Sequence, residues 1–449
     1  MPIDVSTWKK LFTLFNPLER LEYNQGDLFV SRPGSVAQEI ADMLSLEVQP
    51  TGKWVVCGSM GSGKSSELVY LARLLENTHS VVAVDMLRSV RSESEDTVNQ
   101  IQASEVLFAI GAGAIRMARE DLGHEVPENL VHDLTSSFEK LLPEGHGIDL
   151  GSILLGVVRF VTSVTSPGEA AVEKAAVGAA GATTGLLGSR RDLKLGGLTR
   201  PVKEGDTGFE KLRISVDNVL SHLRDLGRGL VVLVDGLDKV NDSGRIRELF
   251  ATTRILAAPW AQIVYTAPID LMLGPLWNAA GGAFNRERLT NVLVEEPALE
   301  RANVSPEAVA EGRQAMGDVV HRRLQRLGLS VDDVFEDGSL DVLIRASGGL
   351  LRDMIHLVNK SVLEALRKRS VKITEEMARD AVVKLRKEFE ITLTTQRVNE
   401  LRHVRKHGET SSDEEFVLDL LHGGYILPYS NGGSWFEPHP ILRGLREGL

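Results

Sequence analysis

Short, continuous apolar runs separated by segments of helical spacing are the most regular feature of the chain. A continuous apolar run bounded by glycine or polar residues is typical of a strand that is buried on both faces. Such runs predict strands at residues 53–57, 80–85, 229–234 and 262–266, with a further short strand at 291–294. Helical spacing predicts helices at residues 36–46, 64–76, 98–119 and 243–256. The first part of the chain therefore has the pattern of an α/β fold.

The second part of the chain is mainly helical and ends in a hairpin. Helical patterns cover residues 306–327, 340–346, 351–368, 374–403 and 414–421. Two short strands, at 425–429 and 435–437, flank Asn431-Gly432-Gly433, which is a hairpin turn signal. We therefore expect a parallel sheet covered by helices, followed by a helical lid and a small C-terminal domain.

These patterns divide the chain into four segments. Residues 1–52 form a helical leader, and residues 53–295 form the α/β domain with an insertion at about 91–228. The helical lid covers 296–405, and the C-terminal domain covers 406–449. Within the insertion, the apolar run 153–164 and the Ala/Gly-rich run 168–188 raise the question of a membrane-surface segment. A packed or flexible insertion is favoured, because these runs lack the basic amphipathic face of an interfacial helix.

Composition and charge exclude several classes of protein. The 449 residues include 51 Lys and Arg against 62 Asp and Glu, so the net charge of −11 disfavours general binding to DNA or anionic lipid. The single cysteine, Cys57, excludes an internal disulfide or a multi-cysteine metal site. The chain has no signal-peptide pattern and no apolar run of 18 residues, so we expect no membrane span and a cytoplasmic protein.

The main chemical signal is a glycine-rich loop between a predicted strand and a predicted helix. Gly58-Ser59-Met60-Gly61-Ser62-Gly63-Lys64-Ser65 matches the pattern G-x-x-x-x-G-K-[ST] in full. Its glycines let the backbone N–H groups and the helix N-terminus point at phosphate oxygens. We expect Lys64 to reach the β and γ phosphates, Ser65 to ligate Mg²⁺, and Ser66 to add a donor to the α phosphate. The sequence thus predicts a nucleotide site.

The nucleotide is expected to be ATP rather than GTP. GTPases usually read guanine with an Asn-Lys-x-Asp turn. The corresponding stretch here, Asn359-Lys360-Ser361-Val362, lacks the aspartate and lies inside a predicted helix.

Two strand ends add further polar candidates. The run Leu230–Asp235 has the form of a Walker B strand, and Asp235 is expected to hold Mg²⁺ directly or through water. Asp238 is the best base or water-orienting group, with a helix N-cap or turn residue as its alternative role. Thr266 ends the next strand, where it could sense the γ phosphate or be an ordinary strand-end threonine.

Arginines from outside the sheet are candidates for contacting the γ phosphate. Arg352 opens a lid helix in the stretch Ser347-Gly348-Gly349-Leu350-Leu351-Arg352, with a solvated helix position as the alternative. Arg254, Arg286 and Arg288 are weaker candidates for a finger that reaches a neighbouring subunit.

Together, the P-loop, the 230–238 segment and the lid motif resemble P-loop ATPases of the AAA+/STAND group, which includes replication initiators. Val234-Asp235-Gly236-Leu237-Asp238 is similar to the NACHT subgroup, although Lys239 stands where that subgroup often has another acid. Residues 28–34 resemble the segment that packs near adenine in initiator-like ATPases. The C-terminal segment, with His439-Pro440-Ile441-Leu442, resembles a winged-helix module. The resemblance covers about residues 28–90, 229–295 and 340–365.

The resemblance implies an ATP- and Mg²⁺-dependent ATPase that acts as a regulatory switch. Such proteins self-associate and gate a protein effector, which suggests bacterial signalling or anti-phage defence. The alternative is a DNA-binding ATPase of the replication-initiator or transposition-loader type, which would use the basic cluster Arg402, Arg405, Lys406 and His407. A small-molecule kinase is a third hypothesis, disfavoured by the long lid.

Overall fold

The fold is known from a computed structural model of the chain. It describes residues 3–19, 23–46, 51–90, 95–143, 158–159, 195–201, 205–252, 254–272, 274–280, 282–297, 304–411, 415–431 and 433–445. Of the two insertion segments singled out above, only residues 158–159 lie within the described residues.

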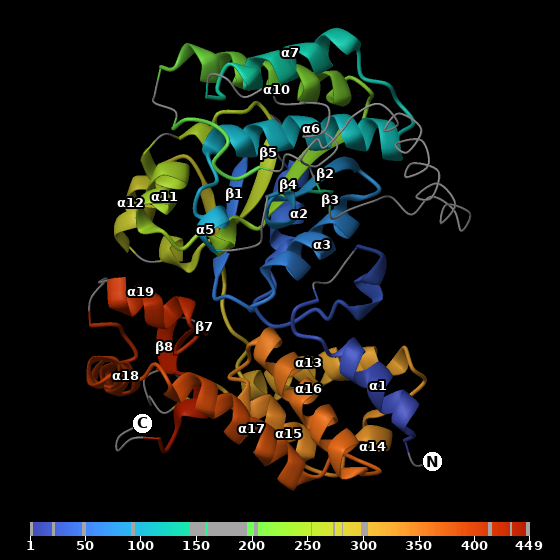
Figure 1. The fold of residues 1–449 in the computed structure, drawn as a ribbon, viewed down its shortest axis with the longest axis vertical. Coiled ribbons are helices and arrows are strands. Elements are labelled where there is room, and N and C mark those ends of the chain that lie inside the picture. The colour runs from blue at the N-terminus through green and yellow to red at the C-terminus, as the bar shows by residue number, and fades with distance from the viewer. Residues whose placement is uncertain are drawn as a thin grey trace.

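A six-stranded sheet forms the centre of the α/β domain (Figure 1). Its order is β3-β2-β4-β5-β1-β6, in which five strands are parallel and β3 pairs antiparallel with β2. The strands are β1 (Lys53–Gly58), β2 (His79–Asp85), β3 (Val158–Arg159), β4 (Gly229–Asp235), β5 (Gln262–Ala267) and β6 (Asn285–Leu289). The predicted strands at 53–57, 80–85, 229–234 and 262–266 are therefore confirmed.

Helices cover both faces of this sheet. The helices on one face are α6 (Ala103–Asp121), α7 (Glu128–Glu139) and α10 (Thr207–Arg224), and on the other face they are α2 (Ala37–Leu46) and α3 (Lys64–Leu75). Alternate residues of β1 point to opposite faces, so Val55 packs in the core under α6 while Val56 packs in the core under α3. Helices from the middle of the chain, α6, α7 and α10, therefore form the layer that covers one face of the sheet.

The helical lid lies at the other end of the molecule from α7 and α10 (Figure 1). It consists of α13 (Pro306–Gln325), α14 (Val331–Val334), α15 (Ser339–Ala346), α16 (Leu351–Lys368) and α17 (Glu375–Glu390). The first helix, α1 (Val5–Leu14), packs into the lid core: Trp8 Nε1 donates to Ser370 O (3.2 Å), and Asn359 Nδ2 donates to Phe12 O (2.7 Å). The leader is therefore divided, since α1 joins the lid and α2 joins the sheet domain.

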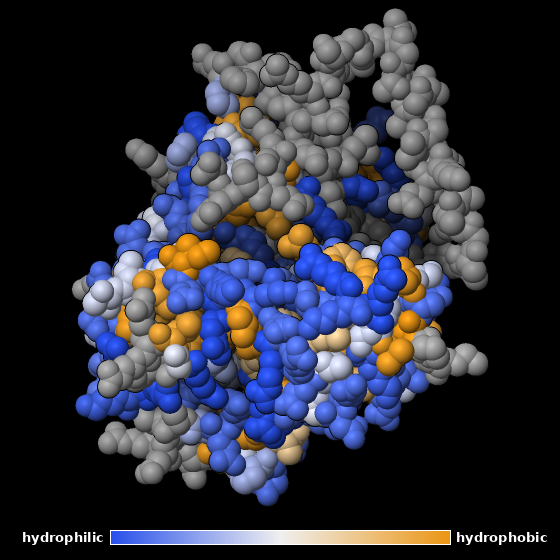
Figure 2. Space-filling model, turned by 60° about the horizontal axis from the view of Figure 1, so that its bottom comes forward, coloured by the Kyte–Doolittle hydropathy of each residue, from blue (hydrophilic) through white to orange (hydrophobic). Residues whose placement is uncertain are grey.

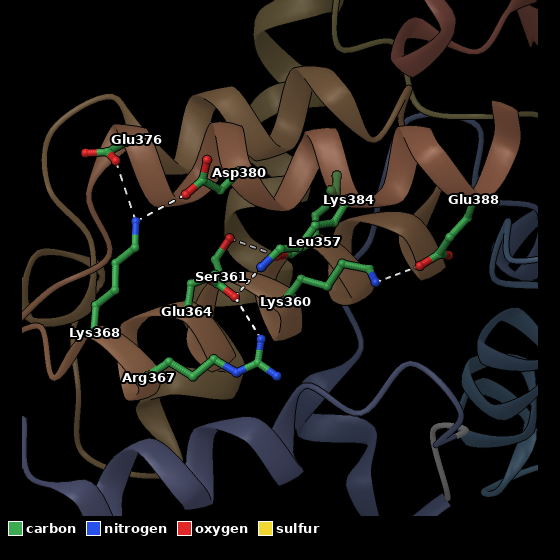
Figure 3. Close-up of polar contacts among 10 residues, drawn as sticks. All are labelled: Leu357, Lys360, Ser361, Glu364, Arg367, Lys368, Glu376, Asp380, Lys384 and Glu388. Atoms are coloured by element: carbon green, nitrogen blue, oxygen red, sulfur yellow. Dashed lines mark hydrogen bonds and ion pairs between the residues drawn. The ribbon is translucent and has the colours of Figure 1, made fainter.

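Ion pairs join α16 to its neighbour α17 (Figure 3). Lys360 Nζ lies 2.8 Å from Glu388 Oε1, and Lys368 Nζ lies 3.2 Å from Asp380 Oδ2. Lys384 reaches back to Glu364 on α16. Such partly exposed pairs add little free energy individually, and the apolar core between the helices supplies most of the stability. Packing and ion pairs thus hold α16 in place against α17, and the N-terminal end of α16 faces the α/β domain.

The C-terminal domain contains two helices and a hairpin. They are α18 (Thr395–His407), α19 (Glu415–His422), β7 (Ile426–Ser430) and β8 (Ser434–Pro438). The predicted hairpin is confirmed, but the single helix predicted at 374–403 is wrong. It is divided into α17 and α18 because the Thr394 side chain accepts a hydrogen bond from Arg397 N (3.3 Å) and starts a new helix there.

Two further predictions are wrong in detail. The helix expected at 243–256 ends early: α11 covers Ser243–Ile246, a π-helical turn covers Arg247–Thr252, and Arg254 has a left-handed φ of 48° that no continuous helix accommodates. The strand expected at 291–294 is absent, because Asn291 N donates to Pro428 O (3.0 Å) and Val292 N to Gly349 O (3.3 Å). The polar strand β6 occupies the sheet edge instead, and its lack of an apolar run concealed it.

The exposed face of the lid and C-terminal domain is mainly hydrophilic, with hydrophobic side chains in small groups (Figure 2). None of the helices in the described ranges combines the length and the apolar character needed to cross a bilayer.

Glu287 on β6 gives a prediction on pH dependence. Burial, together with the nearby carboxylate of Glu39, raises the pKa of Glu287 from 4.5 to about 7. The folded protein then holds this proton more tightly than the unfolded chain, so the free energy of unfolding falls as the pH rises from 4.5 through 7. Glu287→Gln should therefore have a higher unfolding temperature than the wild type at pH 8 and a similar one at pH 5, as calorimetry can measure. An identical pH dependence in both proteins would contradict this prediction.

Candidate nucleotide-binding site

The predicted phosphate-binding loop connects β1 to α3, as the sequence indicated. Gly61 and Gly63 have φ values of 89° and 101°, in the left-handed region that favours glycine. A Cβ on Gly61 would lie 2.7 Å from Arg352 Cβ, and one on Gly63 would lie 2.7 Å from Leu351 Cδ1. Both glycines are therefore needed for the turn of the loop and for the close approach of the lid helix α16.

Lys64 lies buried at the start of α3 and contacts the loop around it. Its Nζ donates to Gly58 O (2.8 Å) and Ser59 O (2.9 Å), and it forms an ion pair with Asp238 Oδ2 at 3.0 Å. The Ser59 and Ser62 hydroxyls are buried and have no hydrogen-bond partner. A phosphate group entering the loop would supply acceptors for all these donors.

The acidic end of β4 lies one strand away from the P-loop strand, because β5 separates β4 from β1. Asp235 is 3% exposed and accepts a hydrogen bond from Thr266 Oγ1 (3.1 Å). Thr266 Oγ1 in turn accepts from Gly236 N (2.9 Å). Thr266 thus contacts Asp235 and the turn after β4, and neither Thr266 nor Asp235 lines the cavity described below. The C-terminal ends of the parallel neighbours β4 and β5 therefore lie side by side.

Asp238 and Lys239 follow on the turn η4 (Leu237–Lys239) and reach the same place as Lys64. Asp238 Oδ2 lies 3.2 Å from Lys239 Nζ as well as 3.0 Å from Lys64 Nζ. Burial alone would raise the pKa of Asp238, but the ammonium groups of Lys239 and Lys64 outweigh it and hold the pKa well below its usual range. Asp238 is therefore an anion, and its buried Oδ1 has no hydrogen-bond partner.

Arg352 approaches from the lid, in the first turn of α16. Its backbone N donates to Gly61 O (3.2 Å), so the lid helix and the P-loop are in direct hydrogen-bonded contact. The Arg352 side chain lines the cavity beside Lys64 and Lys239. Of the five predicted catalytic side chains, Lys64, Asp238 and Arg352 line one space, whereas Asp235 and Thr266 contact each other outside its lining.

This space is a cavity of about 360 Å³ between the α/β domain and the lid. Its polar lining includes Lys64, Ser65, Ser66, Glu67, Asp238, Lys239 and Arg352. Its apolar lining includes Leu28, Phe29, Val30, Val319 and Ile355. Phe29 stacks on Tyr70, with ring centroids 4.0 Å apart. A lining with both polar and apolar side chains suits a ligand that combines phosphates with a nucleobase.

Arg32 is a structural residue that the sequence did not single out. Its Nη2 donates to Ser62 O (2.9 Å), its Nη1 donates to Thr290 O (2.9 Å), and its Nε lies 3.7 Å from Glu67 Oε1. Glu67 also accepts from Val36 N and Ala37 N (3.1 Å each) at the start of α2. This network ties residues 32–37 to the P-loop. The only signal was the resemblance of residues 28–34 to a segment near adenine.

Arg323 on α13 is a second residue that the sequence missed. It lines the cavity and donates from Nη1 to Val319 O (3.1 Å). Burial, together with the neighbouring charge of Arg326, lowers the pKa of Arg323 to about 10. An arginine in a helical pattern carries no sequence signal that separates it from an exposed one.

The three candidate finger arginines lie elsewhere. Arg286 Nη1 donates to Leu271 O (2.9 Å), with its guanidinium 4.2 Å from the centre of the Trp277 ring. Arg288 Nη1 contacts Ser434 Oγ at 3.4 Å. None of Arg254, Arg286 and Arg288 lines the cavity.

Magnesium fits the oxygen donors near the P-loop. Ser65 and Asp238, whose Oδ1 has no hydrogen-bond partner, line the cavity and offer hard oxygen ligands, whereas the carboxylate of Asp235 lies outside this lining. No group of three or more His, Cys, Asp or Glu side chains among the described residues could hold a metal ion alone. This donor set suits an ion that takes its remaining ligands from water and phosphate.

Comparisons with known proteins give only distant similarities. No protein-family model matches the chain, and no curated protein matches it. Among solved structures, it is similar to the Aeropyrum pernix ORC2 protein in ADPNP and ADP complexes, at 11% identity and a TM-score of 0.38, covering 95% of this chain and 93% of that one. It is also similar to Drosophila ORC bound to DNA, at 11% identity and a TM-score of 0.39, covering 99% of this chain and 94% of that one. A Thermotoga maritima RuvB mutant is similar at 10% identity and a TM-score of 0.35, covering 95% of this chain and 98% of that one. Because these identities and TM-scores are low, the description of the fold is based on the parallel sheet and the P-loop of the chain itself.

Proposed function

We propose that this chain is a magnesium-dependent ATPase of the AAA+/STAND group that acts as a regulatory switch. One observation carries the proposal: the P-loop, the acidic turn after β4 and Arg352 of the lid converge on one cavity. Phosphoryl transfer depends mainly on positioning and on neutralising charge at the phosphate oxygens, and these three parts supply both.

Each residue has a distinct task in this proposal. The N–H groups of residues 58–65 bind phosphate oxygens, and Lys64 exchanges its carbonyl contacts for the β and γ phosphates. Ser65 and Asp235 hold Mg²⁺, which supplies charge neutralisation when bound. Asp238, an anion beside the phosphate end, orients the attacking water. Arg352 binds the γ phosphate from the lid.

The position of the cavity supports a switch. Its walls come from both the α/β domain and the lid, so a bound nucleotide contacts both and favours one relative orientation. The C-terminal domain contacts both parts as well: Pro428 O accepts from Asn291 N (3.0 Å), and His439 Nε2 lies 3.0 Å from Asp353 Oδ2 on α16. From the resemblance to STAND ATPases, we infer an output of self-association or of gating a protein effector in signalling or defence.

The nucleotide we propose is ATP. Asn359 and Lys360, the stretch closest to a guanine-reading motif, lie on α16 and contact Phe12 O and Glu388. They serve packing of the lid, and neither lines the cavity.

Titration with fluorescent nucleotides tests the proposed function. The purified chain should bind ATP and ADP, with GTP at least about tenfold weaker, and should release phosphate from ATP only with Mg²⁺. Absence of nucleotide binding would reject the proposal. Transfer of labelled phosphate to a metabolite would instead support the kinase alternative.

A DNA-dependent ATPase is the second candidate. The observation in its favour is the basic end of α18, where Arg402 and Lys406 are exposed. Repeating the phosphate-release assay with duplex DNA at two salt concentrations separates the candidates. Stimulation that weakens as salt rises would favour DNA binding, and an unchanged rate would favour the protein-gating switch.

A further inference from the structure

Lys239 is a charged residue of the cavity that has no role in the mechanism above. It ends the short turn η4, directly after β4, and its backbone N donates to Gly236 O (3.3 Å). Gly236 has a φ of 95°, and a Cβ there would lie 2.8 Å from Leu87 N. This tight turn sets the path of the backbone after β4 and thereby fixes the position of the Lys239 backbone.

The Lys239 side chain shares one carboxylate oxygen with the P-loop lysine. Asp238 Oδ2 lies 3.2 Å from Lys239 Nζ and 3.0 Å from Lys64 Nζ. The Lys239 side chain is only 19% exposed and lines the same cavity as Lys64 and Arg352. Two ammonium groups therefore meet at a single oxygen, on the side of the cavity where the phosphates would bind.

Cationic side chains gather at this part of the cavity. Lys64, Lys239 and Arg352 line it, and Lys64 and Lys239 share the carboxylate of Asp238. Burial lowers the pKa of Lys239, and the charges of Lys64 and Arg352 lower it further, while Asp238 opposes this shift. Like charges this close repel strongly in a partly buried site, so an additional anion is stabilised there.

We propose that Lys239 is a phosphate-binding residue that contacts the terminal phosphate of a bound triphosphate. The inference rests on the proposed function and identifies one more ligand of the same site. When a triphosphate enters, Lys239 donates to an oxygen of the terminal phosphate and stays close to Asp238, so that the carboxylate keeps a cation beside it.

The competing explanation is that Lys239 only neutralises Asp238. In that case, its loss would affect ATP and ADP equally, because the effect would act through Asp238 and Lys64. Contact with the terminal phosphate would instead affect the triphosphate alone. The ratio of the two affinities therefore separates a ligand from a structural partner.

Nucleotide affinities of Lys239→Gln measure this ratio. With Mg²⁺, AMP-PNP should bind about tenfold more weakly than to the wild type, as expected for one lost charge-assisted hydrogen bond, while ADP affinity should change less than about twofold. Lys239→Arg should restore most of the AMP-PNP affinity. Lys211→Gln, an exposed lysine of α10, is the control and should change neither.

Lysine labelling of the unmodified protein gives a measurement that does not depend on the variants folding. An amine-reactive reagent followed by mass spectrometry should show Lys239 protected by AMP-PNP and less protected by ADP. Equal protection, or an unchanged affinity ratio in Lys239→Gln, overturns the proposal for Lys239. If the wild type binds no nucleotide at all, the proposed function fails first, and the two failures are thereby distinguished.

Discussion

Lys64→Ala should weaken ATP binding by about 100-fold or more. The Lys64 ammonium is the buried cation of the P-loop, only 3% exposed, and it donates to two loop carbonyls at 2.8 and 2.9 Å. In the nucleotide complex these donors would serve the β and γ phosphates, and two charge-assisted hydrogen bonds account for an effect of about this size. Titration with a fluorescent ATP analogue measures it.

The control for this experiment is Lys211→Ala. Lys211 is an exposed lysine on α10 that does not line the cavity, so its removal should leave the affinity unchanged. Because Asp238 keeps Lys239 as a partner when Lys64 is lost, we expect the variant to fold. Wild-type affinity in a folded Lys64→Ala protein would reject the site.

Asp235→Asn should reduce Mg²⁺-dependent phosphate release by about 100-fold while leaving ATP bound. The amide keeps the shape of the side chain and can still accept from Thr266 Oγ1, so the buried contact at 3.1 Å is preserved. What is lost is the negative charge that would hold the metal, and metal stabilisation of the transition state amounts to several kcal/mol. A phosphate-release assay and a binding titration on the same sample measure both effects.

Asp225→Asn is the matched control, since Asp225 is an exposed residue at the C-terminal end of α10. Its rate should equal that of the wild type over the whole range of Mg²⁺ concentration. Full activity of Asp235→Asn would show that Asp235 does not hold the metal, and would leave Asp238 as the acidic residue to test next.

The parts of the fold that could be predicted from sequence are those with a strong local pattern. The β1–loop–α3 unit and β4 combine a continuous apolar run with a motif, and both are placed within one or two residues. The helix Leu351–Lys368 was predicted with these bounds because its apolar face is regular. In the candidate site, the same patterns single out Lys64, Asp235 and Asp238, of which Lys64 and Asp238 line the cavity.

The parts that could not be predicted depend on contacts between distant segments. The edge strand β6 has no apolar run, and its pairing with β1 alone defines it. Arg32 and Arg323 look like ordinary polar positions in the sequence, and only their place beside the P-loop and in the cavity gives them a role. The break between α17 and α18 depends on the Thr394 cap, which the longer helical spacing conceals.

The contact between Gly61 and Arg352 has a consequence for how this sequence can diverge. A Cβ on Gly61 would lie 2.7 Å from Arg352 Cβ, and Gly61 O accepts the backbone N–H of Arg352 at 3.2 Å. The glycine is thus constrained twice, once by the turn of its own loop and once by a helix far away in the chain. Relatives that replace this glycine must also move the start of the lid helix, because every residue except glycine at position 352 keeps the Cβ that causes the clash.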